Sequence, residues 1–160
     1  MTEFDSKELA QRTQDHLNGY VKFADQKASI LLTAQLAFIG LYANILRSAW
    51  SSAELNFKLF SVLTIAAGIA AVTSYGWTIY PRTPGTARGL ILWKSIADMG
   101  VDDYKQQMES LSREEAFEEL LDENHKLATV ASEKYRYLRV SLLLTAVMVG
   151  LALVAIASIL

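Results

Sequence analysis

The 160-residue sequence contains no cysteine, two histidines and two prolines. Without cysteine it forms no disulfide, thiolate metal site or thiol nucleophile. His16 and His125 have no second histidine at metal-ligand spacing, so we expect neither a metal nor a cofactor. Walker loops, dinucleotide fingerprints and nucleophile elbows are absent as well. We therefore expect that the protein is not an enzyme.

Charged side chains are missing from three long apolar stretches, residues 28–46, 59–80 and 140–160. At about 1.5 Å per residue, each stretch reaches roughly 30 Å as a helix, which matches the hydrocarbon layer of a membrane. The second and third stretches are apolar all round, unlike amphipathic helices of soluble proteins. The sequence predicts an all-α membrane protein with three transmembrane helices, one membrane-bound unit over residues 1–160.

Lysine and arginine are distributed unevenly around these spans. Nine lie between Pro81 and Arg139, four precede the first span, and two, Arg47 and Lys58, lie in the short link after it. The positive-inside tendency places residues 1–27 and 81–139 in the cytoplasm and the C-terminus outside. The N-terminal residues lack the pattern of a cleaved signal, so we expect the first span to be a retained anchor.

The polar segments also show helical patterns. Residues 1–27 form a cytoplasmic arm, whose apolar spacing predicts an amphipathic helix running into the first span. The apolar residues in the stretch 87–99 indicate either a helix or a buried strand. This stretch belongs to a cytoplasmic region, residues 81–139, that we expect to be mainly helical. Asp102 or Asp103 is expected to cap a brief helix.

A longer helix is predicted from Arg113 to near the C-terminus, because Ser112 and Glu115 have the spacing of a capping box and neither proline nor glycine follows before Gly150. Its apolar stripe over residues 117–138 suits a helix partner in the same chain or in another protein.

Small residues recur every four positions in two spans, which favours close helix contacts within the chain or with a neighbouring subunit. These residues are Ala66, Ala70, Ser74, Ala146 and Gly150, with Ala67 and Ala71 beside the first three. Three helices enclose little space, so a pore requires a homo-oligomer. Polar residues of the first two spans are candidates to line it: Gln35, Asn44, Thr64, Thr73, Ser74 and Thr78. The net charge of −2 gives no indication of binding to a nucleic acid polymer.

The arm runs into the first span through Ala24-Asp25-Gln26-Lys27-Ala28-Ser29. This sequence resembles the Pycsar effector proteins of the transmembrane type, the PycTM family, whose signature centres on an A-D-x-K-A-S element. The signature residues here are Asn18, Tyr20, Phe23, Ala24, Asp25, Lys27 and Ser29. Further landmarks of the family are Tyr80-Pro81-Arg82, Ile91-Leu92-Trp93 and Lys134-Tyr135. We expect Asp25 and Lys27 to hold the arm against the cytoplasmic region, since a carboxylate near the bilayer is costly unless partnered.

The resemblance implies a bacterial anti-phage effector. In such systems a cyclic CMP or cyclic UMP messenger is made on infection, and the multi-pass effector responds by impairing the inner membrane. The partners implied are the lipid bilayer, a cyclic pyrimidine mononucleotide and further copies of the chain. A constitutive channel or transport subunit, and a membrane scaffold that recruits a partner through the stripe over residues 117–138, are the alternatives.

A cyclic nucleotide site should combine cations with aromatic stacking. The cations we consider are Arg82, Arg88, Lys94, Lys134 and Arg136, and the stacking residues are Trp93, Tyr104 and Tyr135. The alternative role for these basic residues is to anchor the membrane ends of the spans. The sequence has no recognisable cyclic-nucleotide-binding β-roll, so direct sensing is a hypothesis.

Overall fold

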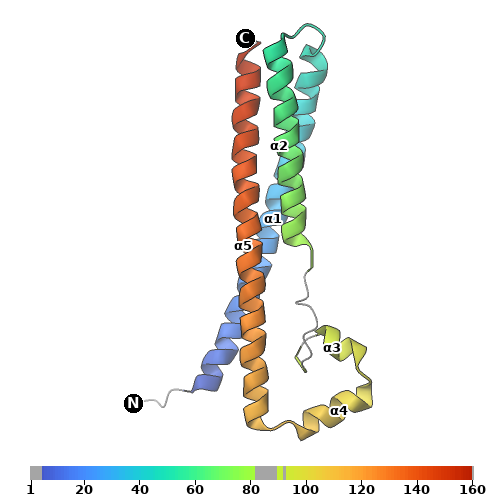
Figure 1. Ribbon diagram of the computed structural model, residues 1–160, viewed down its shortest axis with the longest axis vertical. Coiled ribbons are helices and arrows are strands. Elements are labelled where there is room, and N and C mark those ends of the chain that lie inside the picture. Colours follow the sequence, from blue (N-terminus) through green and yellow to red (C-terminus); the bar gives the residue numbers. More distant parts are fainter. Residues whose placement is uncertain (1–4, 82–89, 92, 160) are drawn as a thin grey trace. The chain divides into compact units, whose positions relative to one another are not determined.

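The structure, a computed structural model, describes residues 5–81, 90–91 and 93–159. These residues form helices and no strand (Figure 1). The helices are α1 (Ser6–Ala49), α2 (Leu55–Ile79), α3 (Trp93–Asp98), α4 (Val101–Ser110) and α5 (Arg113–Ala157). Three of them, α1, α2 and α5, are long and apolar enough to cross a membrane. The predicted all-α membrane fold with three spanning helices is confirmed.

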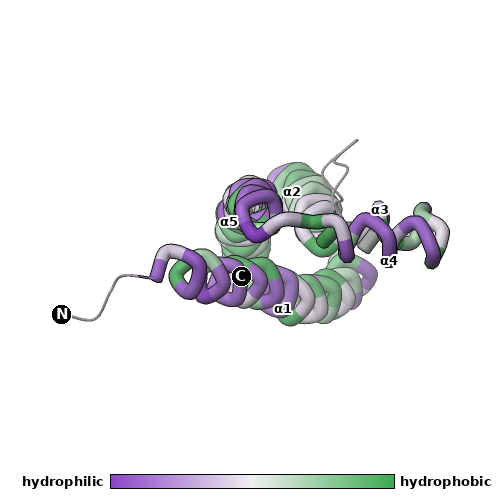
Figure 2. The backbone as a smooth tube through the Cα atoms, turned by 90° about the horizontal axis from the view of Figure 1, so that it is seen from below, coloured by the Kyte–Doolittle hydropathy of each residue, from purple (hydrophilic) through white to green (hydrophobic). Residues whose placement is uncertain are grey.

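Two helices extend well beyond their apolar spans. The 44 residues of α1 run without a break from the polar arm into the first span, as its spacing predicted. The 45 residues of α5 likewise begin at Arg113 and continue through the third span, which confirms the predicted single helix. In Figure 2 the N-terminal part of α1 alternates between hydrophilic and hydrophobic residues, and α4 is mostly hydrophilic.

Local chemistry sets two of the helix boundaries. Helix α2 ends at Ile79, just before Pro81, a residue that lacks the donor of a continuing helix. At the start of α5, the Ser112 backbone donates to Glu115 Oε2 at 2.8 Å, and the Glu115 backbone donates to Ser112 Oγ at 3.2 Å. The predicted capping box is therefore confirmed. Its hydrogen bonds from Ser112 hold the pKa of Glu115 below its ordinary value.

Two local predictions are wrong or incomplete. Asp102 and Asp103 do not cap α4, because Gly100 occupies the N-cap position and both acids lie in the first turn, where their charge favours the helix dipole. In the stretch 87–99, helix α3 covers only Trp93–Asp98, and Leu90 and Ile91 lie outside it. Residues 87–89 and 92 lie outside the described part of the chain.

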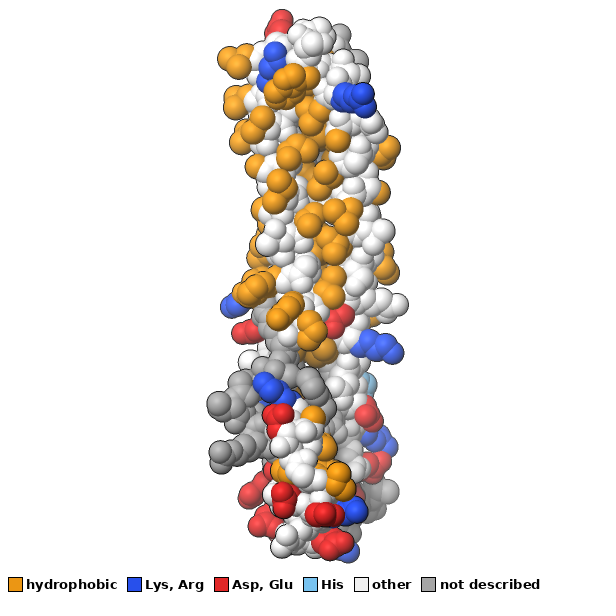
Figure 3. All heavy atoms as spheres, turned by 90° about the vertical axis from the view of Figure 1, so that its right-hand side faces the viewer, with side chains coloured by type: hydrophobic (Ala, Val, Ile, Leu, Met, Phe, Trp, Pro, Cys, Tyr) orange, Lys and Arg blue, Asp and Glu red, His pale blue; other side chains and the backbone are white. Residues whose placement is uncertain are grey.

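The chain divides into two compact units. The first unit contains Met1–Phe23 and Pro81–Glu133, and the second contains Ala24–Tyr80 and Lys134–Leu160. The second unit holds the three apolar spans. On the face shown in Figure 3, hydrophobic side chains are spread along the length of the spanning helices. That residues 1–160 form one membrane-bound domain stays a prediction.

Within the second unit, the buried residues of α2 follow one another at intervals of four and three positions in turn. This spacing is typical of helices that pack as in left-handed coiled coils. The buried residues are Phe57, Ser61, Thr64, Gly68, Ala71, Tyr75 and Thr78. Side chains of α1 and α5 come close to the backbone of α2 at Gly68, where an added Cβ would lie 3.1 Å from Ile39 and 3.2 Å from Met148.

Of the small residues chosen from the sequence, Ala71 lies in the buried core, but four others do not. Ala66, Ala70, Ala146 and Gly150 are exposed in the single chain, so of the two contacts that the sequence left open for them, the one within the chain is not formed. Their contact with a neighbouring subunit stays a prediction. Ser74 is half-buried and does face α5, as described below.

Candidate functional site

Lys134, on α5, joins three helices of the second unit. Only 5% of its side chain is exposed, so its ammonium group needs partners inside the protein. Nζ lies 2.5 Å from Oδ1 of Asp25, on α1, and donates a second hydrogen bond of 2.8 Å to the backbone oxygen of Thr78, on α2. The three spanning helices therefore meet at one cation.

The position of Thr78 explains why a lysine fits there. Thr78 lies in the last turn of α2, where carbonyl groups have no partner within the helix. A cation next to such a terminus also interacts favourably with the helix dipole. The carboxylate of Asp25 supplies the opposite charge and is itself 35% exposed. Together the carboxylate and the terminal carbonyl replace hydration that the ammonium group loses on burial.

Hydrogen bonds between side chains continue from this cation into the apolar bundle. Ser141 Oγ donates to Ser74 Oγ at 2.8 Å, and Ser74 Oγ donates to the backbone oxygen of Tyr137 at 3.3 Å. Farther along α5, Thr145 Oγ1 donates to Gln35 Oε1 at 3.1 Å and lies 3.1 Å from Tyr75 Oη. These contacts link α1, α2 and α5 through polar groups.

The same pattern extends toward the other end of the spans, where Tyr42 Oη lies 2.8 Å from Ser61 Oγ. Gln35 uses its amide nitrogen as well, donating to the sulfur of Met148 at 2.8 Å. We call this set the polar seam: Asp25, Gln35, Tyr42, Ser61, Ser74, Tyr75, Lys134, Ser141, Thr145 and the carbonyl of Thr78.

The polar seam is enclosed by apolar packing. Ala28, Ala71, Tyr75 and Leu138 form one buried cluster, with Leu31, Leu32, Ile79, Tyr135 and Leu144 packed against it. A second cluster consists of Tyr42, Phe57, Ala152 and Ala155. Polar side chains inside a membrane bundle are costly unless they bond one another, and each bond between spans contributes about 0.6–2 kcal/mol. The seam is therefore a stabilising core whose members depend on each other.

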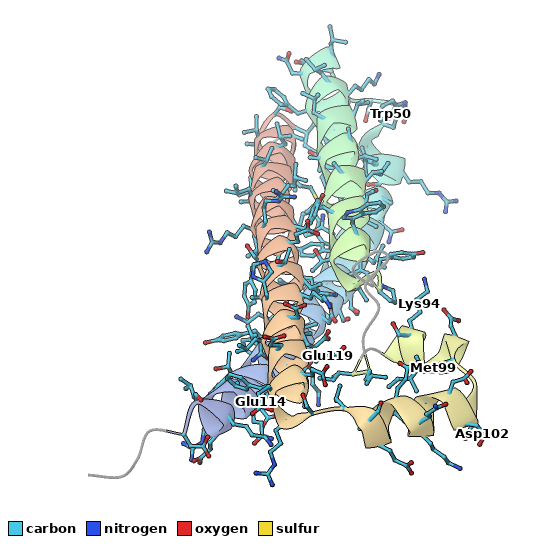
Figure 4. All side chains as sticks on the ribbon, turned by 60° about the horizontal axis from the view of Figure 1, so that its bottom comes forward. Trp50, Lys94, Met99, Asp102, Glu114 and Glu119 are labelled. Atoms are coloured by element: carbon cyan, nitrogen blue, oxygen red, sulfur yellow. The ribbon has the colours of Figure 1, made fainter. Side chains whose placement is uncertain are left out.

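The predicted ligand residues fall in both units. In the first unit, Lys94 on α3 is exposed and Tyr104 on α4 is half-buried; Figure 4 labels Lys94. Trp93 begins α3. Arg82 and Arg88 lie outside the described residues. In the second unit, Lys134 belongs to the polar seam, so the sequence assigned a ligand-binding role to a residue that the structure places in an ion pair.

The other two predicted ligand residues are neighbours of Lys134. Tyr135 packs against the cluster around Leu138, and the guanidinium of exposed Arg136 lies 5.3 Å from the ring centre of Tyr137. A ligand-binding role for any of these residues stays a prediction. In the described part of the chain, no group of three or more histidine, cysteine or acidic side chains is arranged to hold a metal ion.

The family signature has a clear physical pattern. Ala24 is fully buried beside Asp25, and a second alanine, Ala28, is buried one turn later. Small side chains here let the neighbouring helices approach α1 closely enough for Lys134 to reach the carboxylate. The other signature residues, Asn18, Tyr20, Phe23, Lys27 and Ser29, are exposed.

Within the first unit, two hydrogen bonds connect distant segments. Asn124, on α5, donates to the backbone oxygen of Ala10, on α1, at 2.8 Å. The Leu90 backbone donates to Glu119 Oε2 at 2.9 Å, and in Figure 4 Glu119 lies on the side of α5 that faces α3. Neighbouring Glu123 is partly buried, and this burial raises its pKa above the ordinary value.

Sequence reasoning expected Asp25 to hold the arm against residues 81–139 but did not name Lys134, within that range, as its partner. A usable signal was present, because Asp25 and Lys134 each lie a few residues before an apolar span and carry opposite charges. Two spans that enter the membrane from the same side bring such residues to the same depth. Charges of opposite sign at the same depth are expected to pair.

The sequence is similar to known proteins. Residues 9–160 match the family model PycTM, described as the Pycsar effector protein domain. The chain is also 30% identical over 131 residues to the Pycsar effector protein SaPycTM of Staphylococcus aureus, which covers 79% of this chain and 78% of that protein. No solved structure matches the chain. On these two similarities, the chain belongs to the Pycsar effector family.

Proposed function

We propose that this effector of anti-phage defence responds to a cyclic pyrimidine mononucleotide, cyclic CMP or cyclic UMP, by impairing the bacterial inner membrane as a homo-oligomer. The family supports the defence role. The observation that carries the membrane step is the polar seam, a set of mutually bonded polar groups inside three helices whose outer surfaces are apolar.

The seam suits a protein that exchanges one packing for another. In the single chain its groups bond one another, and Gln35, Ser61 and Ser141 are buried. If the helices separate and meet helices of other copies, the same groups face a shared interior and bond water instead. An aqueous path then forms without exposing charged residues to lipid.

A messenger produces such a change only by binding one packing better than the other. Converting a protein from about 1% to about 99% of the active packing requires a difference of roughly 5.5 kcal/mol. Removing one partner of a buried ion pair lowers the stability of the packing that contains it by about 3–5 kcal/mol. The contacts of Lys134 can therefore supply part of the free energy that holds the resting packing until a ligand binds.

In this proposal the N-terminus and residues 81–139 face the cytoplasm, where the messenger is made, and the C-terminus faces outward. The distribution of lysine and arginine supports this orientation. The lipid bilayer, the messenger and further copies of the chain are the partners. The response needs no enzymatic step and no nucleic acid polymer, since ligand binding and helix rearrangement are sufficient.

Dye release from liposomes tests the proposal. The purified chain is reconstituted, and release is followed with no nucleotide, with cyclic UMP, with cyclic CMP and with cyclic AMP as the control. We expect release only with a cyclic pyrimidine. Equal release without nucleotide would instead identify a constitutive channel.

No release, together with specific capture of a protein partner, would favour the scaffold. The structure gives the scaffold less support, because Leu120, Ala131 and Leu138 of its proposed stripe are already buried within the chain.

A further inference from the structure

The polar arm of α1 carries a groove that the functions above leave unassigned. It has a volume of about 550 Å³ and lies within the first unit. Its described wall is one face of α1, with residues at intervals of three and four positions: Arg12, Asp15, His16, Gly19, Tyr20 and Phe23. The opposite face of this segment, which includes Ala10, is the one turned into the protein.

The chemistry of this face is ordered along the helix. Arg12 and His16 lie toward the N-terminal end and offer donors for an anion. Tyr20 and Phe23 lie toward the other end, and 55% and 49% of these residues are exposed. Tyr20 lies eight positions after Arg12, a rise of about 12 Å along the helix. The long arginine side chain can shorten the distance to the ring further.

Gly19 lies between the anion-binding end and the aromatic end. A glycine inside a helix is less stable than an alanine, and a Cβ added at Gly19 would meet nothing within 4 Å. No packing within the described protein therefore requires the glycine. Its missing side chain leaves room for a flat ring to approach the backbone next to Tyr20.

Arg12 is held by a contact that a ligand can displace. Its guanidinium pairs with Glu8 one turn earlier, but the two side chains are 72% and 58% exposed. Such an exposed ion pair contributes little. A phosphate that reaches Arg12 exchanges one weakly bound oxyanion for another, and Asp15 can accept a hydrogen bond from a sugar hydroxyl.

From this order of donors, open helix surface and aromatic rings we infer that the groove binds the messenger. Its phosphate lies against Arg12 and His16, its ribose lies beside Asp15 and Gly19, and its base stacks on Tyr20. This inference rests on the proposed function and assigns its ligand to a site outside the residues predicted from the sequence. A phospholipid headgroup shares the phosphate chemistry but has no aromatic base to stack.

Calorimetry on the full-length protein in lipid nanodiscs, with cyclic UMP and cyclic CMP, tests the site. We expect Arg12→Ala to weaken binding about ten- to a hundredfold, because it removes a charge-assisted hydrogen bond. Tyr20→Ala should weaken binding about five- to a hundredfold, whereas Tyr20→Phe, which keeps the stacking ring, should leave the affinity almost unchanged. Glu8→Gln should strengthen binding, by up to about fivefold, since it frees Arg12.

Gly19→Leu should abolish binding by filling the groove, and Gln11→Leu, at an exposed position of the same arm outside the groove, serves as its control. Circular dichroism of each variant shows whether α1 remains helical. If the wild-type protein binds a cyclic pyrimidine and these substitutions leave its affinity unchanged, the site is wrong while the proposed function stands. If the wild-type protein binds neither nucleotide, both are wrong.

Nanodiscs with and without phosphatidylglycerol distinguish the lipid headgroup. The proposal expects the nucleotide affinity of the wild-type protein to change little between the two. A groove that prefers the anionic lipid would show nucleotide binding only in nanodiscs without it, and this result would overturn the assignment to the messenger.

Discussion

The ion pair between Asp25 and Lys134 predicts unequal effects from removing either charge. Asp25→Asn leaves an ammonium group that is 5% exposed without a counter-charge, whereas Lys134→Met leaves a carboxylate that is 35% exposed and can be hydrated. Removing one partner of a fully buried ion pair destabilises the folded protein by about 3–5 kcal/mol, because the other charge is left buried without a partner. Because Asp25 is partly exposed, we reduce this to about 2–4 kcal/mol for Asp25→Asn.

For Lys134→Met we expect about 1 kcal/mol or less, since methionine fills similar volume and removes the buried charge. The double variant should be about as stable as Lys134→Met alone, so the second substitution rescues the first. Double-mutant cycles measure this coupling, which should equal the cost of Asp25→Asn alone, about 2–4 kcal/mol.

The measurement is unfolding of the full-length protein in mixed micelles, followed by circular dichroism as the fraction of denaturing detergent rises. Asp122→Asn, an exposed carboxylate on α5, is the matched control and should have almost no effect. The reasoning is refuted if Asp25→Asn costs no more than Lys134→Met, or if the double variant is as unstable as Asp25→Asn.

Three further predictions concern other contacts. Ser112→Ala should destabilise the start of α5 by about 1 kcal/mol, and Glu115→Gln should lose stability relative to wild type above pH 4.5, the ordinary pKa of the group. Since the folded pKa is lowered, this difference should disappear as the pH falls through that lowered pKa, and Glu114→Gln is the control in thermal unfolding. Gly68→Leu should destabilise the second unit by about 1–3 kcal/mol by overpacking against Ile39 and Met148; Gly40→Leu, where a Cβ meets nothing within 4 Å, should be nearly neutral in the same micelle assay. Asn124→Leu should raise the midpoint of thermal unfolding, because the buried Oδ1 of Asn124 has no hydrogen-bond partner in the described structure; a fall in the midpoint would show that its bond to Ala10 matters more.

Helix type and length followed directly from the sequence. The three spans, the continuous helix from Arg113 and the capping box at Ser112 each depend on residues close in sequence, so local patterns were sufficient. The errors at Asp102 and Asp103 were also local. An acid in the first turn and an acid at the cap are both favourable, and their spacing does not distinguish them.

The pairing of helix faces was harder to predict. In a soluble helix the buried face is the apolar one, but in these spans lipid and core are both apolar, so hydrophobic periodicity carries no signal. On α2, the buried row combines residues as different as Phe57, Ser61 and Gly68. The alanines at 66 and 70 looked equally suitable and are exposed. The interior is marked by polar residues that bond across helices, such as Gln35 and Ser141. Exposed Asn44 and Thr73 instead bond the backbone of their own helix.

The strength of the polar contacts between the spans limits how the resting packing can be released. Losing the pair through Lys134→Met costs the resting packing about 1 kcal/mol or less, well below the roughly 5.5 kcal/mol needed for a nearly complete switch. The remainder must come from bonds deeper in the seam, such as Thr145 with Gln35 and Tyr42 with Ser61, at about 0.6–2 kcal/mol each. Lys134→Met should therefore increase messenger-free dye release without making it complete. Adding Gln35→Leu, which also removes a polar group that the open state needs, should lower release again rather than raise it.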